Sequence, residues 1–124
     1  MVRRKRGTEN EVVQIPETAV LDREQLREVT MDDEELMREI LIALVDDTSR
    51  QLALLAGAIE EQDAQKTARL AHYSKGACAN VGANRAASVL KEIENQAAAR
   101  SFSDCAVTLQ ALTREVELLR VEAR

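Results

Sequence analysis

Apolar side chains return every three or four positions along most of this chain, the spacing that places them on one face of an α-helix. The longest stretch with this spacing spans about residues 33–61. Its stripe comprises Met37, Leu41, Leu44, Thr48, Leu52, Leu55 and Ile59. Because the chain has one proline, only four glycines and few strand signals, we predict a long helix here and a helical chain throughout.

The same spacing predicts three further helices, beginning near residues 64, 84 and 102, and a short helix over about residues 20–29. In the first of the three, the expected inward-facing residues are Thr67, Leu70, Ser74, Ala77 and Val81, with Cys78 alongside. In the second they are Ala86, Leu90, Ile93 and Ala97. In the third they are Cys105, Leu109, Leu112, Val116 and Leu119. Alternating steps of four and three in the last set suit the packing of antiparallel helices in a bundle.

Start and stop signals separate these helices. Asp32, with Glu35 three residues later, resembles a capping box before the long helix. Gly82 suits the end of the helix that follows the long one, because glycine adopts the left-handed conformation of a helix C-terminus at least cost. The expected N-caps of the last three helices are Asp63, Asn84 and Ser101.

Residues 1–18 lack periodicity, and we expect them to form a flexible basic and polar tail. Residues 19–124 form one domain in this interpretation, a length that suffices for a single hydrophobic core. The predicted fold is all-α: an antiparallel up-down-up-down four-helix bundle with a short extra N-terminal helix. With 45% hydrophobic but only 2% aromatic residues, its core must consist of Leu, Ile, Val and Ala.

The charge of the chain limits its partners. The formal net charge is −5, and a basic run at residues 3–6 contributes +4, leaving −9 on the remainder. An acidic body argues against binding to duplex nucleic acid. The basic run itself is most simply a solvated tail, although contact with nucleic acid or an anionic membrane stays an alternative.

Several features predict a cytoplasmic, monomeric protein without a metal or cofactor of its own. No apolar run approaches the length of about 18 residues that a membrane span needs, and a polar stretch follows the basic start, unlike a signal peptide. Cys78 and Cys105 have no metal-ligand spacing and lie on apolar stripes, so they are expected to be buried free thiols.

The chain has a single histidine, His72, which is the main candidate for chemistry. It lies two residues after Leu70, about 200° around the helix, so it should face solvent. Lys75 and Gly76 follow at the third and fourth positions, on the same face. An exposed nucleophile beside a cation, with a glycine that clears the approach, suits transfer of a phosphoryl group. Taken singly, each residue is equally compatible with an ordinary helix surface.

The segment Ala71-His72-Tyr73-Ser74-Lys75-Gly76-Ala77-Cys78-Ala79-Asn80-Val81-Gly82-Ala83 resembles the signature of the histidine phosphotransfer (HPt) domain. That signature has an Ala-His pair, Lys and Gly at the third and fourth positions after the histidine, small residues, and a final apolar-Gly-Ala. Ser74 replaces a usual apolar residue, and Ala77 replaces a frequent serine. The resemblance extends over about 100 residues.

The resemblance implies a carrier in a phosphorelay rather than an enzyme. His72 would accept the phosphoryl group, Lys75 would contact its oxygens, and Gly76 would admit the partner. Glu94, 22 residues after the histidine, would bind Nδ1 of its ring; alternatively it is a solvated acid beside Lys91. Receiver domains of response regulators and a hybrid sensor histidine kinase would be the partners, and the receiver would supply Mg²⁺. The alternative function is a non-phosphorylated helical adaptor that only docks to a receiver or kinase.

Overall fold

The computed structural model describes residues 19–124, and the predicted tail at residues 1–18 lies outside this range. Every regular element in the described part is an α-helix. The helices are α1 (Arg23–Val29), α2 (Glu34–Glu60), α3 (Ala64–Val81), α4 (Asn84–Ala98) and α5 (Phe102–Glu122). The predicted antiparallel four-helix bundle with a short N-terminal helix is confirmed.

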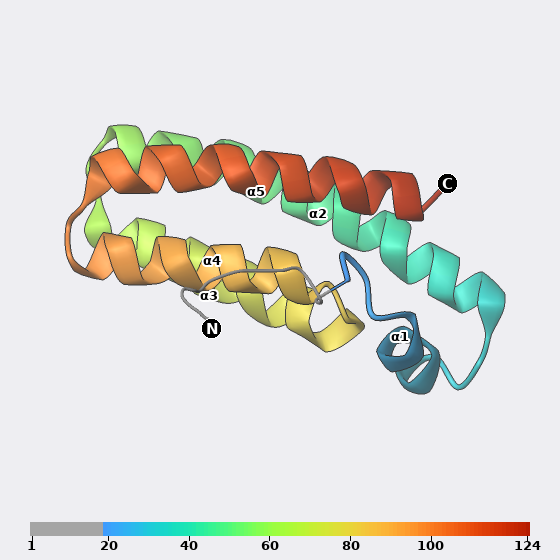
Figure 1. Cartoon of the computed structure of the whole chain (residues 1–124). Coiled ribbons are helices and arrows are strands. Elements are labelled where there is room, and N and C mark those ends of the chain that lie inside the picture. Colours follow the sequence, from blue (N-terminus) through green and yellow to red (C-terminus); the bar gives the residue numbers. More distant parts are fainter. Residues whose placement is uncertain (1–18) are drawn as a thin grey trace, which may run out of the picture.

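The four long helices lie in two layers, with α2 and α5 in one and α3 and α4 in the other (Figure 1). Helix α1 packs at the end of the bundle where α3 turns into α4 (Figure 1). Each long helix runs antiparallel to its two neighbours, since a short turn joins each to the next (Figure 1). None of the described helices has the length and apolar character needed to span a membrane.

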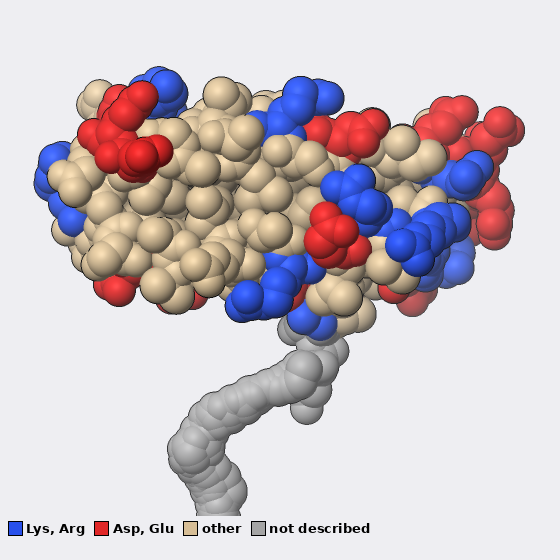
Figure 2. Space-filling model, turned by 90° about the horizontal axis from the view of Figure 1, so that it is seen from above, with Lys and Arg blue, Asp and Glu red and all other residues tan. Residues whose placement is uncertain are grey.

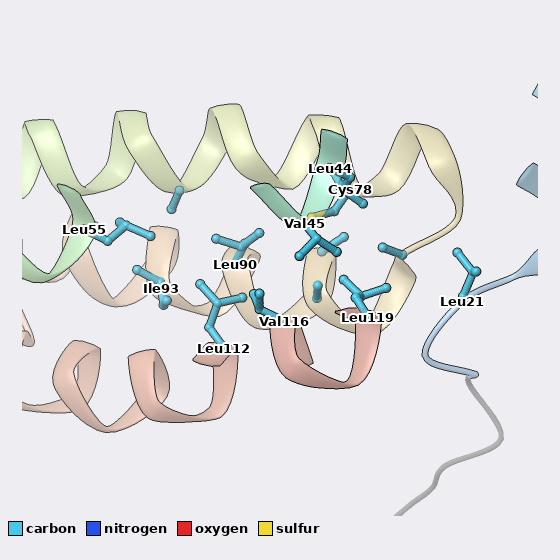
Figure 3. Packing of buried hydrophobic residues seen from close by; sticks show 14 of the residues in the cluster. Leu21, Leu44, Val45, Leu55, Cys78, Leu90, Ile93, Leu112, Val116 and Leu119 are labelled. Carbon is cyan, nitrogen blue, oxygen red and sulfur yellow. The ribbon is translucent and has the colours of Figure 1, made fainter. Parts of the chain in front are cut away.

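Aliphatic side chains from all four long helices meet between the two layers (Figure 3). Leu90, Ile93, Leu112 and Leu119 are fully buried there, and Leu55 joins them from α2. Burying a leucine or isoleucine side chain contributes about 1.5–3 kcal/mol. The core therefore contains the aliphatic residues that the composition requires.

Two predicted helix boundaries are confirmed in detail. Asp63 caps α3, its carboxylate accepting a hydrogen bond from the Lys66 backbone N–H at 3.0 Å. Gly82 ends α3 in the left-handed conformation, with φ of 94°. A Cβ atom at Gly82 would lie 2.7 Å from the Asp22 carbonyl oxygen, so α1 and the α3–α4 turn approach each other where only glycine fits. The Asp22 N–H donates to the Gly82 carbonyl at 2.8 Å across this contact.

Three predicted caps were wrong or incomplete. Asp33, not Asp32, caps α2, because Asp32 is in the left-handed conformation with φ of 64° and lies in the turn before it. Asn84 is already the first residue of α4; Ala83 is the cap, and the Asn84 amide donates to Gln25 of α1 at 3.4 Å. Ser101 does cap α5, but its hydroxyl makes no capping hydrogen bond.

The buried face of α3 also differs from the predicted stripe. Thr67 and Ser74 are buried as predicted, but Ala71 and Cys78 complete the face, while Leu70, Ala77 and Val81 are only half-buried. The buried face of α3 therefore contains Ala71 and Cys78 where the hydrophobic pattern indicated Leu70 and Ala77, one residue earlier in the sequence. Small side chains suit this position because they let α3 approach α2 and α4 closely. On the C-terminal helix, Leu109 is likewise half-buried rather than fully buried.

The Ser74 hydroxyl is buried and has no hydrogen-bond partner among residues 19–124. An unpaired buried hydroxyl is destabilising, and alanine is also the better helix former. Ser74→Ala is therefore expected to raise the free energy of unfolding by about 1 kcal/mol, measured as a higher urea midpoint at unchanged slope. Exposed Ser88 of α4 is the control, since Ser88→Ala reports helix propensity alone. Equal gains for the two variants would show that burial of the Ser74 hydroxyl has no cost.

Candidate functional site

His72 is in the middle of α3, and 68% of its side chain is exposed. The predicted outward orientation is thus observed. The residue before it, Ala71, is fully buried, so His72 lies at the border between the buried and the exposed face of α3 and not on the side opposite the core. At this border the ring lies next to α4, within reach of Glu94.

Glu94 of α4 joins the two polar side chains of α3. One carboxylate oxygen, Oε2, lies 3.1 Å from Nδ1 of His72. The other, Oε1, accepts a hydrogen bond from Nζ of Lys75 at 2.9 Å. Only 27% of the Glu94 side chain is exposed, and Lys75 is equally covered. The structure therefore brings His72, Lys75 and Glu94 into one polar cluster, and Glu94 is not the freely solvated acid of the alternative interpretation.

The geometry of Glu94 sets the chemistry of the imidazole. A carboxylate at Nδ1 favours the tautomer that carries its proton on Nδ1, because that N–H then donates to Oε2. The lone pair of the other ring nitrogen, Nε2, is then free and belongs to a largely exposed side chain. This arrangement holds a nitrogen nucleophile at the surface in a fixed orientation.

The cluster also stabilises the charged form of Glu94. The hydrogen bond from Lys75, and the smaller effect of His72, lower the pKa of the Glu94 carboxyl, although partial burial opposes the shift. A lowered pKa means that the folded state favours the carboxylate. The stability it contributes is therefore present above the pKa of an unfolded glutamate, about 4.3, and is lost as the pH falls through the folded value.

We therefore expect the Glu94 carboxyl to titrate below the ordinary pKa of a glutamate, about 4.3, when its carboxyl carbon is followed by NMR. In a Lys75→Gln variant the pKa of Glu94 should return towards the ordinary range, because its principal hydrogen-bond donor has lost its charge. An unchanged Glu94 titration in the variant would contradict the ion pair.

Gly76 leaves the surface beside His72 open. It follows the histidine by four residues, so the two lie on the same face of α3 in successive turns. It is exposed, and a Cβ atom built on it would meet nothing within 4 Å. Packing within the bundle therefore does not require glycine here, although glycine in a helix costs about 1 kcal/mol relative to alanine. The open space faces outward, where another molecule can approach.

Tyr73 and Asp47 form a contact beside the site that the sequence did not indicate. The Tyr73 side chain is 56% exposed, and its hydroxyl donates to Oδ2 of Asp47 on α2 at 3.3 Å. Asp47 also accepts from Arg50 at 3.4 Å. Each residue looks like an ordinary surface position in the sequence, and the contact arises only when α2 and α3 pack antiparallel.

The two thiols take no part in this surface. Cys78 and Cys105 are buried, as predicted. Burial raises the pKa of the Cys78 thiol to about 11, and burial also raises that of Cys105. Neither thiol is an effective nucleophile at neutral pH, because the thiolate is the reactive form. No group of three or more His, Cys, Asp or Glu side chains within residues 19–124 is placed to hold a metal ion.

Comparison with known proteins identifies the family of this chain. The sequence model of the Hpt domain matches residues 39–122, so the chain belongs to the Hpt domain family. Proteins of this family carry phosphoryl groups in phosphorelays, where they interact with receiver domains and kinases. They are carriers and in general not catalysts. No curated protein sequence matches the chain at a significant level.

Two solved structures are similar to this fold. One is the crystal structure of histidine-containing phosphotransfer protein B from Pseudomonas aeruginosa PAO1, with a TM-score of 0.77 and 27% identity, covering 84% of this chain and 90% of that one. The other is the X-ray structure of a rice protein assigned as a histidine-containing phosphotransfer protein, with a TM-score of 0.76. It shares 22% identity over 84% of this chain and 76% of the rice chain, and it bears on the fold alone.

Proposed function

We propose that this chain is a phosphorelay carrier that accepts a phosphoryl group on Nε2 of His72 from the phospho-aspartate of a receiver domain or from a hybrid sensor histidine kinase. It then passes the group to the aspartate of another receiver domain. The observation that carries the proposal is the orientation of the chain's single histidine: its Nδ1 lies against Glu94 while most of the ring is exposed.

In the uptake step, the lone pair of Nε2 attacks the phosphorus atom of the aspartyl phosphate. The N–P bond forms as the bond between phosphorus and the aspartate oxygen breaks, and the partner's carboxylate leaves with that electron pair. The Nδ1 proton stays in its hydrogen bond with Glu94, which stabilises the positive charge that the ring gains. The reverse reaction with a second aspartate releases the group.

Lys75 is the cation that shares a hydrogen-bond partner, Glu94, with His72. In the resting protein its Nζ binds Glu94, so contact with phosphoryl oxygens requires this lysine to share or exchange that partner. A phosphoryl group carries more negative charge than a carboxylate and offers three oxygens, which favours the exchange. Lys75→Ala should therefore slow transfer without unfolding the bundle, because Lys75 does not belong to the hydrophobic core.

We place Mg²⁺ in the receiver domain, where it would neutralise charge on the phosphoryl oxygens during transfer. The carrier's own residues contribute the nucleophile, its orientation and an accessible surface.

The proposal is tested by incubating the purified chain with receiver domains of its host charged with radiolabelled acetyl phosphate. A transferred label that is lost in acid and stable in base identifies phosphohistidine. Binding to a receiver in the absence of any label would instead favour the docking adaptor. A label with the opposite stability, lost in base, would contradict transfer to histidine.

A further inference from the structure

Charge is divided unequally between the two layers of the bundle. Helix α3 has three Lys or Arg residues and no acidic residue, and α4 has two of each sign, so their layer carries a net +3. Helix α2 has two Arg and six acidic residues, and α5 has two Arg and four, giving the other layer −6. The imidazole of His72 thus lies in the positive layer of an otherwise acidic protein.

The α2–α5 layer shows a different surface. Seen from above in Figure 2, its middle is largely uncharged, and acidic and basic side chains gather towards its two ends. Residues 51–59 of α2 and 105–113 of α5 contain no charged side chain. A charged partner therefore has little to bind at the centre of this face.

Two exposed cations flank the His72 cluster in the positive layer. Arg69 precedes His72 by three residues, so it lies one turn away on the same side of α3. Lys91 precedes Glu94 by three residues, so it lies one turn away from Glu94 on the same side of α4. Both side chains are exposed, and within residues 19–124 neither forms an ion pair.

Two acidic side chains near this surface are engaged by local partners, whereas Glu92, beside Lys91 on α4, is exposed and accepts a hydrogen bond from Gln96. Glu94 binds Lys75 and His72, and Asp47 binds Tyr73 and Arg50. The charges of Arg69 and Lys91 therefore remain available to a molecule that approaches His72.

We propose that Arg69 and Lys91 attract and orient a partner whose docking face is acidic, namely the face of a receiver domain around its phospho-aspartate. The inference rests on the proposed function. Such a face carries a phosphoryl dianion and the carboxylates that hold its Mg²⁺, so it is complementary to a basic rim. Exposed charges at the rim of an interface act mainly on the rate of association, and their effect weakens as salt is added.

The test compares two double charge reversals that change the net charge equally. Arg69→Glu with Lys91→Glu alters the proposed rim. Arg38→Glu with Arg114→Glu alters two exposed arginines of α2 and α5 that form no ion pair in the described part of the chain. The rate constant for transfer is measured with the host receiver domain that labels the wild-type chain fastest, charged with acetyl phosphate, at several salt concentrations.

At low salt the rim variant should transfer about tenfold more slowly than the wild type, and the difference should vanish at high salt. The control variant should stay within about twofold of the wild type. An unchanged rate in the rim variant, an equal loss in both variants, or a loss that salt does not relieve would each overturn the proposed steering while leaving His72 as the acceptor. A wild-type chain that no receiver labels would contradict the proposed function and, with it, this inference.

Discussion

A His72→Gln variant is expected to take up no phosphoryl group, with a loss of at least about a thousandfold in transfer rate. The amide of glutamine has no nucleophilic lone pair comparable to that of Nε2, and the chain contains no other histidine. The fold should survive, because 68% of the histidine side chain is exposed. Label transfer from a charged receiver and helical circular dichroism are measured on the same preparation.

Tyr73→Phe is the matched control for this change, since Tyr73 is the exposed neighbour whose hydroxyl only reaches Asp47. It should keep its uptake of label within about twofold, because the bond to Asp47 is exposed and contributes little. An acid-labile label on the His72→Gln variant would show that a different residue accepts the group, and the mechanism would then be wrong.

Gly76→Gln should slow transfer by about a hundredfold while leaving the protein folded, since a small displacement of reacting groups costs about that much. The added side chain has room within the bundle, because nothing lies within 4 Å of its Cβ position, so its bulk extends into the space that the partner needs. Glutamine is also a better helix former than glycine, and the free energy of unfolding should rise by about 0.5 kcal/mol. Transfer kinetics and urea unfolding measure the two effects separately.

Gly57 of α2 provides the control for this variant. It too is inside a long helix, and a Cβ atom there would also meet nothing within 4 Å. Gly57→Gln should show the same gain in stability but transfer at the wild-type rate. Wild-type transfer in Gly76→Gln would mean that the open space beside His72 is not the path of approach.

The sequence predicted the fold because each helix carries its own local signals. The stripe from Met37 to Ile59, the Asp63 cap and the left-handed Gly82 all act within a few residues of chain. All are present, except that Leu52 of the stripe is only half-buried. Asn84 was misplaced for a physical reason: its side chain forms a contact with Gln25, 59 residues away, which no local pattern records. Local signals therefore determine the elements, and tertiary contacts determine how their ends are used.

The candidate site shows the same division. Helix spacing alone predicted that His72 faces outward. Leu70 was expected to face inward, and a residue two positions later lies about 200° further around the helix. The ion pair between Lys75 and Glu94 could not be predicted in this way, since it depends on the rotation and relative position of α3 against α4. The rotation and position of α3 are set by small buried residues such as Ala71, whereas the hydrophobic pattern predicted Leu70 as the inward-facing residue.

In the proposed mechanism, Glu94 holds Nδ1 of His72 and leaves Nε2 to carry the phosphoryl group. In the phosphorylated, ¹⁵N-enriched protein, NMR coupling between phosphorus and the ring nitrogens of His72 identifies the bonded atom directly. We predict that the phosphorus couples to Nε2 as its bonded nitrogen. A phosphoryl group bonded to Nδ1, or to no nitrogen of His72, would contradict this account.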